Sequence, residues 1–251
     1  MTASPTVVVR NLTKRFGLKS VLRSLDFQAE AGEFIALLGP NGTGKTTFLR
    51  ILASLTRFTQ GDIQINGYRL PAQSALIRQQ LGFVSHQPLL YGDLSAIENL
   101  QFYGRMYGIT GLDARINEIL EMVGLLARRS DYVRTYSRGM QQRLSIGRAI
   151  LHRPALLLFD EPYTGLDQEA CNILDVILRK VTASGHTIIM TSHDLARTSQ
   201  LAARFDVMLF GKIISSFHQE DIPSHNLAEM YEQILVRELE TPQEPQRAIN
   251  Q

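Results

Sequence analysis

A glycine-rich segment followed by lysine and threonine gives the clearest chemical signal in the chain. It reads Gly39-Pro-Asn-Gly-Thr-Gly44-Lys45-Thr46 and fits the eight-residue phosphate-loop pattern. Glycines let backbone N–H groups crowd around a phosphate chain, the lysine reaches the β- and γ-phosphates, and the threonine hydroxyl ligates Mg²⁺. The alternative is a glycine-rich turn that binds nothing. The residues expected to contact the nucleotide are Gly39, Asn41, Gly42, Gly44, Lys45, Thr46 and Thr47.

Two adjacent carboxylates form a second candidate site. Asp160 and Glu161 follow the apolar run Leu156–Phe159, at the edge where parallel sheets place their ligands. Successive strand residues point in opposite directions, so Asp160 can face a metal while Glu161 reaches an attacking water. A solvated strand end is the ordinary alternative, and the phosphate loop elsewhere in the chain favours metal and water chemistry.

A third segment, Tyr136-Ser137-Arg138-Gly139-Met140, begins a predicted helix. Ser137 is a good N-cap, and Met140, Leu144 and Leu151 share one face of the helix. The N-terminus of such a helix aims free N–H groups at an anion. Taken by itself, the segment is better explained as an ordinary capped surface helix.

This third segment resembles the signature of the nucleotide-binding subunits of ATP-binding cassette (ABC) transporters, which reads Leu-Ser-Gly-Gly-Gln. Ser137 and Gly139 match the signature, whereas Tyr136, Arg138 and Met140 depart from it. Met140 cannot supply the hydrogen bonds of the family's glutamine. The resemblance covers nearly all of residues 6–235, because further family motifs follow in the expected order.

Four more residues fall where the family contacts nucleotide. Gln87 matches the Q-loop glutamine, which touches Mg²⁺ or water and reports to the membrane subunit through a helical lobe. His193 matches the switch histidine, which bonds the γ-phosphate, and Asp167 matches the D-loop aspartate at the dimer seam. Phe16 stands where the family stacks an aromatic ring on adenine. A lone glutamine or histidine after a strand is often incidental, and Phe16 could be a core aromatic.

Short apolar runs bounded by turn residues predict the strands that position these groups. The runs are Thr6–Val9, Phe34–Leu38, Gly61–Ile65, Leu81–Val84, Leu156–Phe159, Thr187–Thr191 and Val207–Leu209. Three of them, at Phe34, Leu156 and Thr187, lack polar alternation, which is typical of strands buried on both faces of a parallel sheet. Between Pro88 and Leu151 the apolar spacing is helical. A final helix is predicted from Leu227, Met230, Tyr231, Ile234 and Leu235.

These elements predict an α/β fold, with a phosphate-loop NTPase core built on a parallel sheet, an antiparallel β part and an inserted helical lobe. We expect a single ABC ATPase domain over residues 1–251, with a core of 1–87 and 153–235. The lobe would cover about residues 88–152, and a frayed tail would cover about residues 240–251. A length of 251 residues is near the upper limit for one hydrophobic core.

Composition excludes several classes of protein. An apolar fraction of 44% argues against disorder, and a net charge of +2 gives no reason to expect a nucleic-acid partner. Cys171 is the one cysteine, so a disulfide scaffold or a cysteine zinc site is impossible and a small helix residue is expected. His86 and His152 match no motif and are interpreted as surface or core residues. No apolar run approaches the roughly 18 residues of a membrane span, and residues 1–10 lack a secretory signal, so we expect a cytosolic chain.

The resemblance implies Mg²⁺-dependent ATP hydrolysis by a subunit that powers a separate membrane permease. Glu161 would activate water, while Thr46, Asp160 and Gln87 would hold Mg²⁺. Ser137 and Gly139 would close the site from a second copy, in a head-to-tail homodimer or a pair with a paralogous ABC subunit. The permease would hold this assembly on the inner face of the cell membrane.

Features of the lobe and of the strand end bear on the cargo. The run Glu98–Gly108, with the signature, is similar to exporter-type subunits for lipids, drugs or polysaccharides, and the run Glu161–Gln168 resembles subunits assigned to haem export in cytochrome c maturation. The main alternative is a soluble ABC ATPase of DNA repair or translation. Those proteins resemble tandem cassettes or cassettes split by a long coiled coil, and neither pattern is present. An unrelated phosphate-loop GTPase would need Asn-Lys-x-Asp, and no Asn in this chain is followed by Lys.

Overall fold

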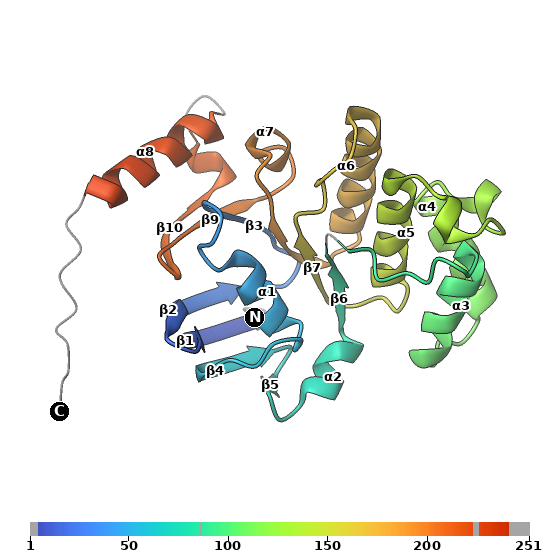
Figure 1. The fold of residues 1–251 in the computed structure, drawn as a ribbon, viewed down its shortest axis with the longest axis horizontal. Helices are drawn as coiled ribbons and strands as arrows, with labels where there is room; N and C mark the ends of the chain where they lie inside the picture. The colour runs from blue at the N-terminus through green and yellow to red at the C-terminus, as the bar shows by residue number, and fades with distance from the viewer. Residues whose placement is uncertain (1–4, 86, 223–225, 241–251) are drawn as a thin grey trace.

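The computed structural model describes residues 5–85, 87–222 and 226–240 (Figure 1). His86 and most of the expected tail, residues 241–251, lie outside these described residues. Two sheets and a group of helices make up the fold, which confirms the predicted α/β class. No helix in the described residues is both long enough and apolar enough to cross a bilayer.

The larger sheet has six strands in the order β10-β9-β3-β8-β7-β6. Its strands are β3 Phe34–Leu38, β6 Leu81–Val84, β7 Leu156–Asp160, β8 Thr187–Thr191, β9 Arg204–Leu209 and β10 Lys212–His218. Strands β6, β7, β8, β3 and β9 pair in parallel, and β10 pairs with β9 in the antiparallel sense. Every residue of β3, β7 and β8 is buried, as their continuous apolar character predicts.

The smaller sheet is antiparallel, in the order β2-β1-β4-β5. Its strands are β1 Val7–Phe16, β2 Lys19–Ala29, β4 Gln60–Ile65 and β5 Tyr68–Leu70. The sequence reasoning missed β2, β5 and β10, and it ended β1 too early. In β2 the buried residues Leu22 and Leu25 are three positions apart, and the β1–β2 register shifts opposite them. Such irregularities break the alternation that identifies a strand.

Helices outside residues 88–152 pack into the hydrophobic cores on the two faces of the larger sheet. They are α1 Lys45–Leu52, α2 Ser74–Gln79, α6 Gln168–Ala183, α7 Leu195–Thr198 and α8 Leu227–Glu240. The inner face of α1 carries Phe48, Leu49 and Leu52, which are fully buried, whereas Leu55 lies beyond the end of the helix and is 53% exposed.

Residues 88–152, all of which the structure describes, contain helices and no strand. The elements are α3 Ala96–Met106, α4 Leu112–Met122, the short turns Leu126–Arg128 and Val133–Thr135, and α5 Arg138–Ile150. A capping box between Ser95 and Glu98 begins α3. Figure 1 shows α3, α4 and α5 on the β6 side of the larger sheet, away from the antiparallel sheet. We call this group the helical lobe.

Candidate nucleotide-binding site

The phosphate loop connects the buried end of β3 to the start of α1. Its glycines Gly39, Gly42 and Gly44 have φ angles of 146°, 83° and 110°, values that other residues rarely adopt. At Gly44 a Cβ atom would also lie 2.7 Å from Leu22 Cδ2. The chain can therefore fold around a phosphate here because these positions carry no side chain.

Lys45 closes this loop from the inside. Its Nζ donates to the carbonyl oxygens of Gly39 at 2.6 Å and Pro40 at 3.0 Å, and the residue is 6% exposed. Burial lowers the pKa of Lys45, and the carboxylates of Glu161 and Asp160 act in the opposite direction. The loop thus concentrates a buried ammonium and several backbone N–H groups in one place, which suits a polyphosphate.

Asp160 joins the phosphate loop to two strands. Its Oδ1 accepts a hydrogen bond from Thr46 Oγ1 at 2.9 Å and another from Thr191 Oγ1 at 3.0 Å. Asp160 and Thr191 are opposite one another in the parallel β7–β8 register. Magnesium prefers hard oxygen ligands at 2.0–2.1 Å in octahedral geometry, which sets neighbouring ligands about 2.9 Å apart. The Thr46 hydroxyl and the Asp160 carboxylate therefore fit such an ion.

Glu161 leaves β7 in a strained conformation beside His193. Its φ is 52°, in the left-handed region that non-glycine residues rarely occupy. Its N–H donates to Thr191 Oγ1 at 3.0 Å and to the Thr191 carbonyl at 3.2 Å. Glu161 Oε1 lies 3.0 Å from His193 Nε2, but the contact lacks hydrogen-bond alignment and leaves this buried oxygen with no hydrogen-bond partner among the described residues.

The environment of Glu161 suits proton transfer. Burial raises the pKa of Glu161, His193 and Lys45 lower it in part, and Asp160 raises it further. A carboxylate with a raised pKa is a stronger base than one in water. The side chain of His193 is 50% exposed, so its ring is accessible to a ligand.

Gln87 and Phe16 are not hydrogen-bonded to the site residues described above. Gln87 is exposed just after β6, and its carbonyl accepts a hydrogen bond from Ser85 Oγ at 2.7 Å. Phe16 is 52% exposed at the end of β1, where Lys14 Nζ lies 4.3 Å from the ring centroid. The alternative of a core aromatic at Phe16 is therefore wrong. Within the part of the chain that the structure describes, neither residue bonds the phosphate loop.

The start of α5, with Ser137 and Gly139, packs against the start of α6, with Asp167. Within the described part of the chain, none of these three residues contacts the phosphate loop. Ser137 caps α5, and its Oγ accepts from Met140 N at 3.3 Å. Asp167 caps α6, and its Oδ1 accepts from Ala170 N at 2.8 Å. A Cβ atom on Gly139 would lie 2.8 Å from Ala170 Cβ. Figure 1 shows strands β6 and β7 between α5 and α1.

Three residues of this region were missed in the sequence. Thr191 hydrogen-bonds both Asp160 and the backbone of Glu161, and its position two residues before His193 was the available signal.

Asp175 and Arg197 form an ion pair, and Tyr163 OH donates to Asp175 Oδ1 at 2.7 Å. This ion pair links α6 with α7, the helix that follows His193. Its residues are 22 positions apart, so no local pattern could reveal it.

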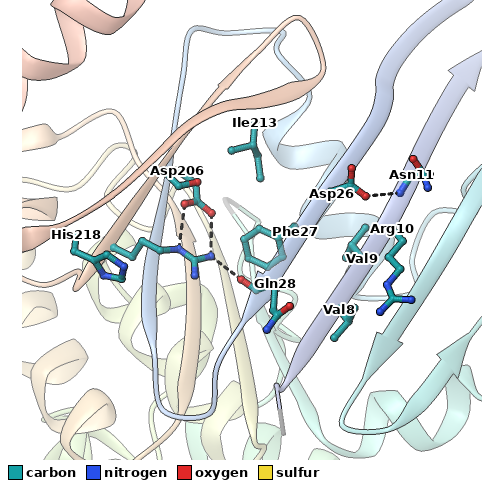
Figure 2. Close-up of a pocket in the computed structure, with 12 residues that line it drawn as sticks. Val8, Val9, Arg10, Asn11, Asp26, Phe27, Gln28, Asp206, Ile213 and His218 are labelled. Carbon is teal, nitrogen blue, oxygen red and sulfur yellow. Dashed lines mark hydrogen bonds and ion pairs between the residues drawn. The ribbon is translucent and has the colours of Figure 1, made fainter. Parts of the chain in front are cut away.

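A separate cavity of about 700 Å³ lies between the antiparallel sheet and strands β9 and β10 (Figure 2). None of its lining residues belongs to the phosphate loop or to the β7 end. Three of its charged groups, Arg204, Asp206 and Asp26, already have partners. Arg204 contacts Asp206, Glu33 and the Gln28 carbonyl, and Asp26 accepts from Asn11 N at 2.8 Å. Nothing in this arrangement indicates a nucleotide.

A phosphate loop on a parallel sheet, with two carboxylates at the neighbouring strand end, defines a phosphate-loop nucleotide hydrolase. The ABC transporter family matches residues 22–164, more than half of the chain. The linearmycin resistance ATP-binding protein LnrL of Bacillus subtilis (strain 168) is 36% identical over 85% of this chain and 70% of its own. The Nod factor export ATP-binding protein I of Burkholderia lata is 38% identical over 82% of this chain and 68% of its own.

Solved structures agree. An ATP-binding subunit of an ABC transporter superposes with a TM-score of 0.81 at 28% identity, covering 92% of this chain and 98% of its own. A dimeric ATP-binding cassette in a post-hydrolysis state with bound ADP and phosphate gives 0.77 at 26% identity, covering 86% and 100%. The chain belongs to the ABC transporter family and is one of its ATP-binding ATPases.

Proposed function

We propose that this chain hydrolyses Mg-ATP between the phosphate loop, which connects β3 to α1, and the end of β7. The hydrolysis drives a separate membrane permease. The observation that carries the proposal is that Thr46 at the phosphate loop bonds Asp160 at the end of β7, while Thr191 bonds both Asp160 and the backbone of the adjacent Glu161. The phosphate loop and Lys45 bind the β- and γ-phosphates. Thr46, Asp160 and Gln87 would hold Mg²⁺, which would neutralise phosphate charge.

Glu161 orients and deprotonates the attacking water, and His193 binds the γ-phosphate at its side. The strained backbone and the raised pKa of Glu161 support this role, because they hold a basic carboxylate in a fixed direction. Phe16, exposed at the end of β1, stacks on adenine. The remaining phosphate contacts come from the backbone at Gly39, Asn41, Gly42, Gly44 and Thr47.

A second copy of the chain, or a paralogous ABC subunit, completes each site in a head-to-tail dimer. Ser137 and Gly139 at the start of α5, together with Asp167, contact the nucleotide held by the partner. The exposure of Ser137 and its lack of any bond to its own phosphate loop support this arrangement. The solved dimeric relative, at 26% identity, supports it independently. We propose a core of residues 1–87 and 153–235 and a lobe of about 88–152 for each copy.

The permease partner would make this chain an exporter subunit on the cytoplasmic face of the cell membrane. The names of LnrL and of the Nod factor export protein support an exporter. Haem export, suggested by the run 161–168, has no support from these relatives. A soluble ATPase of DNA repair or translation is not favoured by them either.

An exposed apolar surface, built from Leu55, Leu89, Tyr91 and Phe102, is our candidate for the permease contact. These side chains are 53%, 47%, 49% and 41% exposed, and the Tyr91 and Phe102 rings meet at 5.0 Å. Leu55 of the core and Leu89 of the lobe line the same pocket, so an apolar helix docked here would contact both parts of the chain. Apolar side chains gathered in this way typically mark a protein contact.

The test of the catalytic assignment compares Lys45→Ala with Glu161→Gln. Lys45→Ala should abolish ATP binding, because it removes the buried charge of the phosphate loop. Glu161→Gln should preserve binding and reduce turnover by about 10²–10⁴, the usual effect of losing a positioned base. Equilibrium ATP binding and steady-state phosphate release measure the two effects. Wild-type turnover by Glu161→Gln would show that another group activates the water.

The docking surface is tested with Tyr91→Ala against Tyr132→Ala. Both tyrosines are 49% exposed in the lobe, so the variants remove similar exposed areas. Leu94, in the same segment, is partly buried and therefore less suitable for substitution. Tyr91→Ala should weaken capture of the permease from detergent-solubilised membranes, with basal ATPase nearly intact, and Tyr132→Ala should not. Equal capture by both variants would contradict the assignment.

A further inference from the structure

Arg138 occupies the contact between the two loops that this chain would present to a second copy. It is the first residue of α5 and stands where the ABC signature has glycine. Its guanidinium packs directly on Gly165, because a Cβ atom built there would lie 2.6 Å from Arg138 Cζ and 2.8 Å from Nε. Gly165 has a φ of 75°, so another residue would be strained there and would also displace the arginine.

Electrostatics do not explain this placement. A positive charge at the N-terminus of a helix is opposed by the helix dipole, and the first turn of α5 contains no acidic residue. No hydrogen bond or ion pair of Arg138 exists within the described residues. The contact that the structure gives to the Arg138 guanidinium is therefore its packing on Gly165.

A second contact joins the same two segments. Gly139 meets Ala170, whose N–H is fixed by the Asp167 side chain at 2.8 Å. The segment that Arg138 and Gly139 touch begins at Glu161, whose carbonyl accepts from Thr164 N at 3.2 Å. Gly165, which Arg138 contacts, is thus four residues from Glu161, the carboxylate proposed as the base.

We propose that Arg138 is a positioning residue that couples the two nucleotide sites of the dimer. The inference rests on the proposed function, in which α5 closes the partner's site while Glu161 acts on the nucleotide of its own chain. Closure of one site moves α5, and Arg138 carries this movement through Gly165 to Glu161 in the other site. Coupling between sites of this kind is a difference in free energy that appears as cooperativity.

The experiment measures ATPase rate against ATP concentration for the full chain and its variants. The wild-type chain should give a Hill coefficient approaching roughly 2, the number of sites, and Arg138→Gly should lower it toward roughly 1. The maximal rate should also fall, because a displaced Glu161 positions the water less well and a small misplacement can cost up to about 100-fold. Arg138→Lys, which keeps the charge but not the planar group, should give an intermediate coefficient.

Gly165→Ala tests the contact from its other side. The added methyl group should displace Arg138 and reproduce the cooperativity loss of Arg138→Gly. Gly185→Ala is the matched control, because Gly185 has a similar φ of 81° and no atom within 4 Å of a built Cβ. The double variant Arg138→Gly with Gly165→Ala should be no less cooperative than either single variant, since both changes remove one contact.

Several results would overturn the inference. The first is a wild-type chain that hydrolyses ATP without cooperativity, and the second is an Arg138→Gly chain with the wild-type Hill coefficient. The third is a double variant whose Hill coefficient is lower than that of either single variant. Lys45→Ala separates these failures from a failure of the proposed function. If Lys45→Ala still bound and hydrolysed ATP, the function would be wrong. If Lys45→Ala were inactive and Arg138→Gly unchanged, only the coupling role would be wrong.

Discussion

The phosphate loop region and the start of α5 differ in how far their polar groups are satisfied within one chain. Lys45, Asp160 and Thr191 are at most 6% exposed and hydrogen-bonded to their neighbours. Ser137 and Arg138 are exposed, and the described bond of Ser137 is to the backbone of its own helix. A helix N-terminus has free N–H groups that need a partner. The polar groups of the first region find their partners within one chain, whereas those of the second region are available to another molecule.

The largest effect predicted from this contrast comes from mixing two inactive variants. Lys45→Ala destroys the phosphate loop, and Ser137→Arg blocks the exposed helix start. If α5 serves the partner, a mixed dimer contains one site with both lesions and one with neither. ATP-dependent dimer closure and nucleotide trapping should then reappear in the mixture.

Trapping is the appropriate measurement here, because hydrolysis can require two working sites. Each variant alone is the control, and heterodimer formation is verified by differently tagged chains. If α5 served its own chain, each site would carry one lesion. A mixture that trapped no more nucleotide than its parts, with heterodimers present, would contradict the contribution of α5 to the partner.

A smaller effect is expected within the self-contained region. Thr191→Val keeps the shape of the side chain but removes the hydroxyl that bonds Asp160 and the Glu161 backbone. We expect the ATPase rate to fall about tenfold, because small displacements of reacting groups are costly, and stability to fall by about 1–2 kcal/mol.

Thr187→Val provides the matched control for this variant. Thr187 lies at the opposite end of the same strand, is also buried, and bonds Thr6 Oγ1 at 3.1 Å and Gly32 N at 3.0 Å. It should lose similar stability and little activity. Equal ATPase losses in the two variants would mean that Thr191 acts on stability alone. Thermal unfolding and steady-state ATPase measurements separate these outcomes.

Local patterns predict one of these two regions better than the other. The sequence identifies Lys45, Thr46 and Asp160 because the phosphate loop is contiguous and the buried strands are uniformly apolar. It does not reveal Thr191 as a bridge, since that role depends on the β7–β8 register. It also gives no hint that Arg138 packs on Gly165, because this contact forms only when α5 meets the segment before α6.

The fold shows the same division. The central parallel strands and α8 are recognisable from apolar spacing, whereas β2 and β10 are not. Their inner and outer faces are irregular, with register shifts in both the β1–β2 and β9–β10 pairs. A strand paired at the edge of a sheet is specified by its neighbour as much as by its own residues.

The smallest predicted effect concerns His152, which lies where the lobe meets the core. Its ring stacks on Tyr107 with centroids 3.8 Å apart, and neither ring nitrogen has a partner in hydrogen-bond geometry among the described residues. Burial lowers the pKa of His152 from 6.5 to about 4, the charges of Arg148 and Arg115 act in the same direction, and the Leu81 backbone opposes them.

Because the folded chain holds His152 neutral, the unfolded chain binds the proton more readily. The stability from this site is complete above pH 6.5 and is lost as the pH falls toward 4. His152→Phe keeps the stack on Tyr107 but cannot be protonated. As the pH falls over that range, the free energy of unfolding should therefore decrease less in this variant than in the wild type, by up to about 3 kcal/mol. The exposed His218, changed to Phe, is the control. Parallel losses of unfolding free energy for the wild type and His152→Phe in denaturant unfolding would show that the junction between lobe and core tolerates a charged ring.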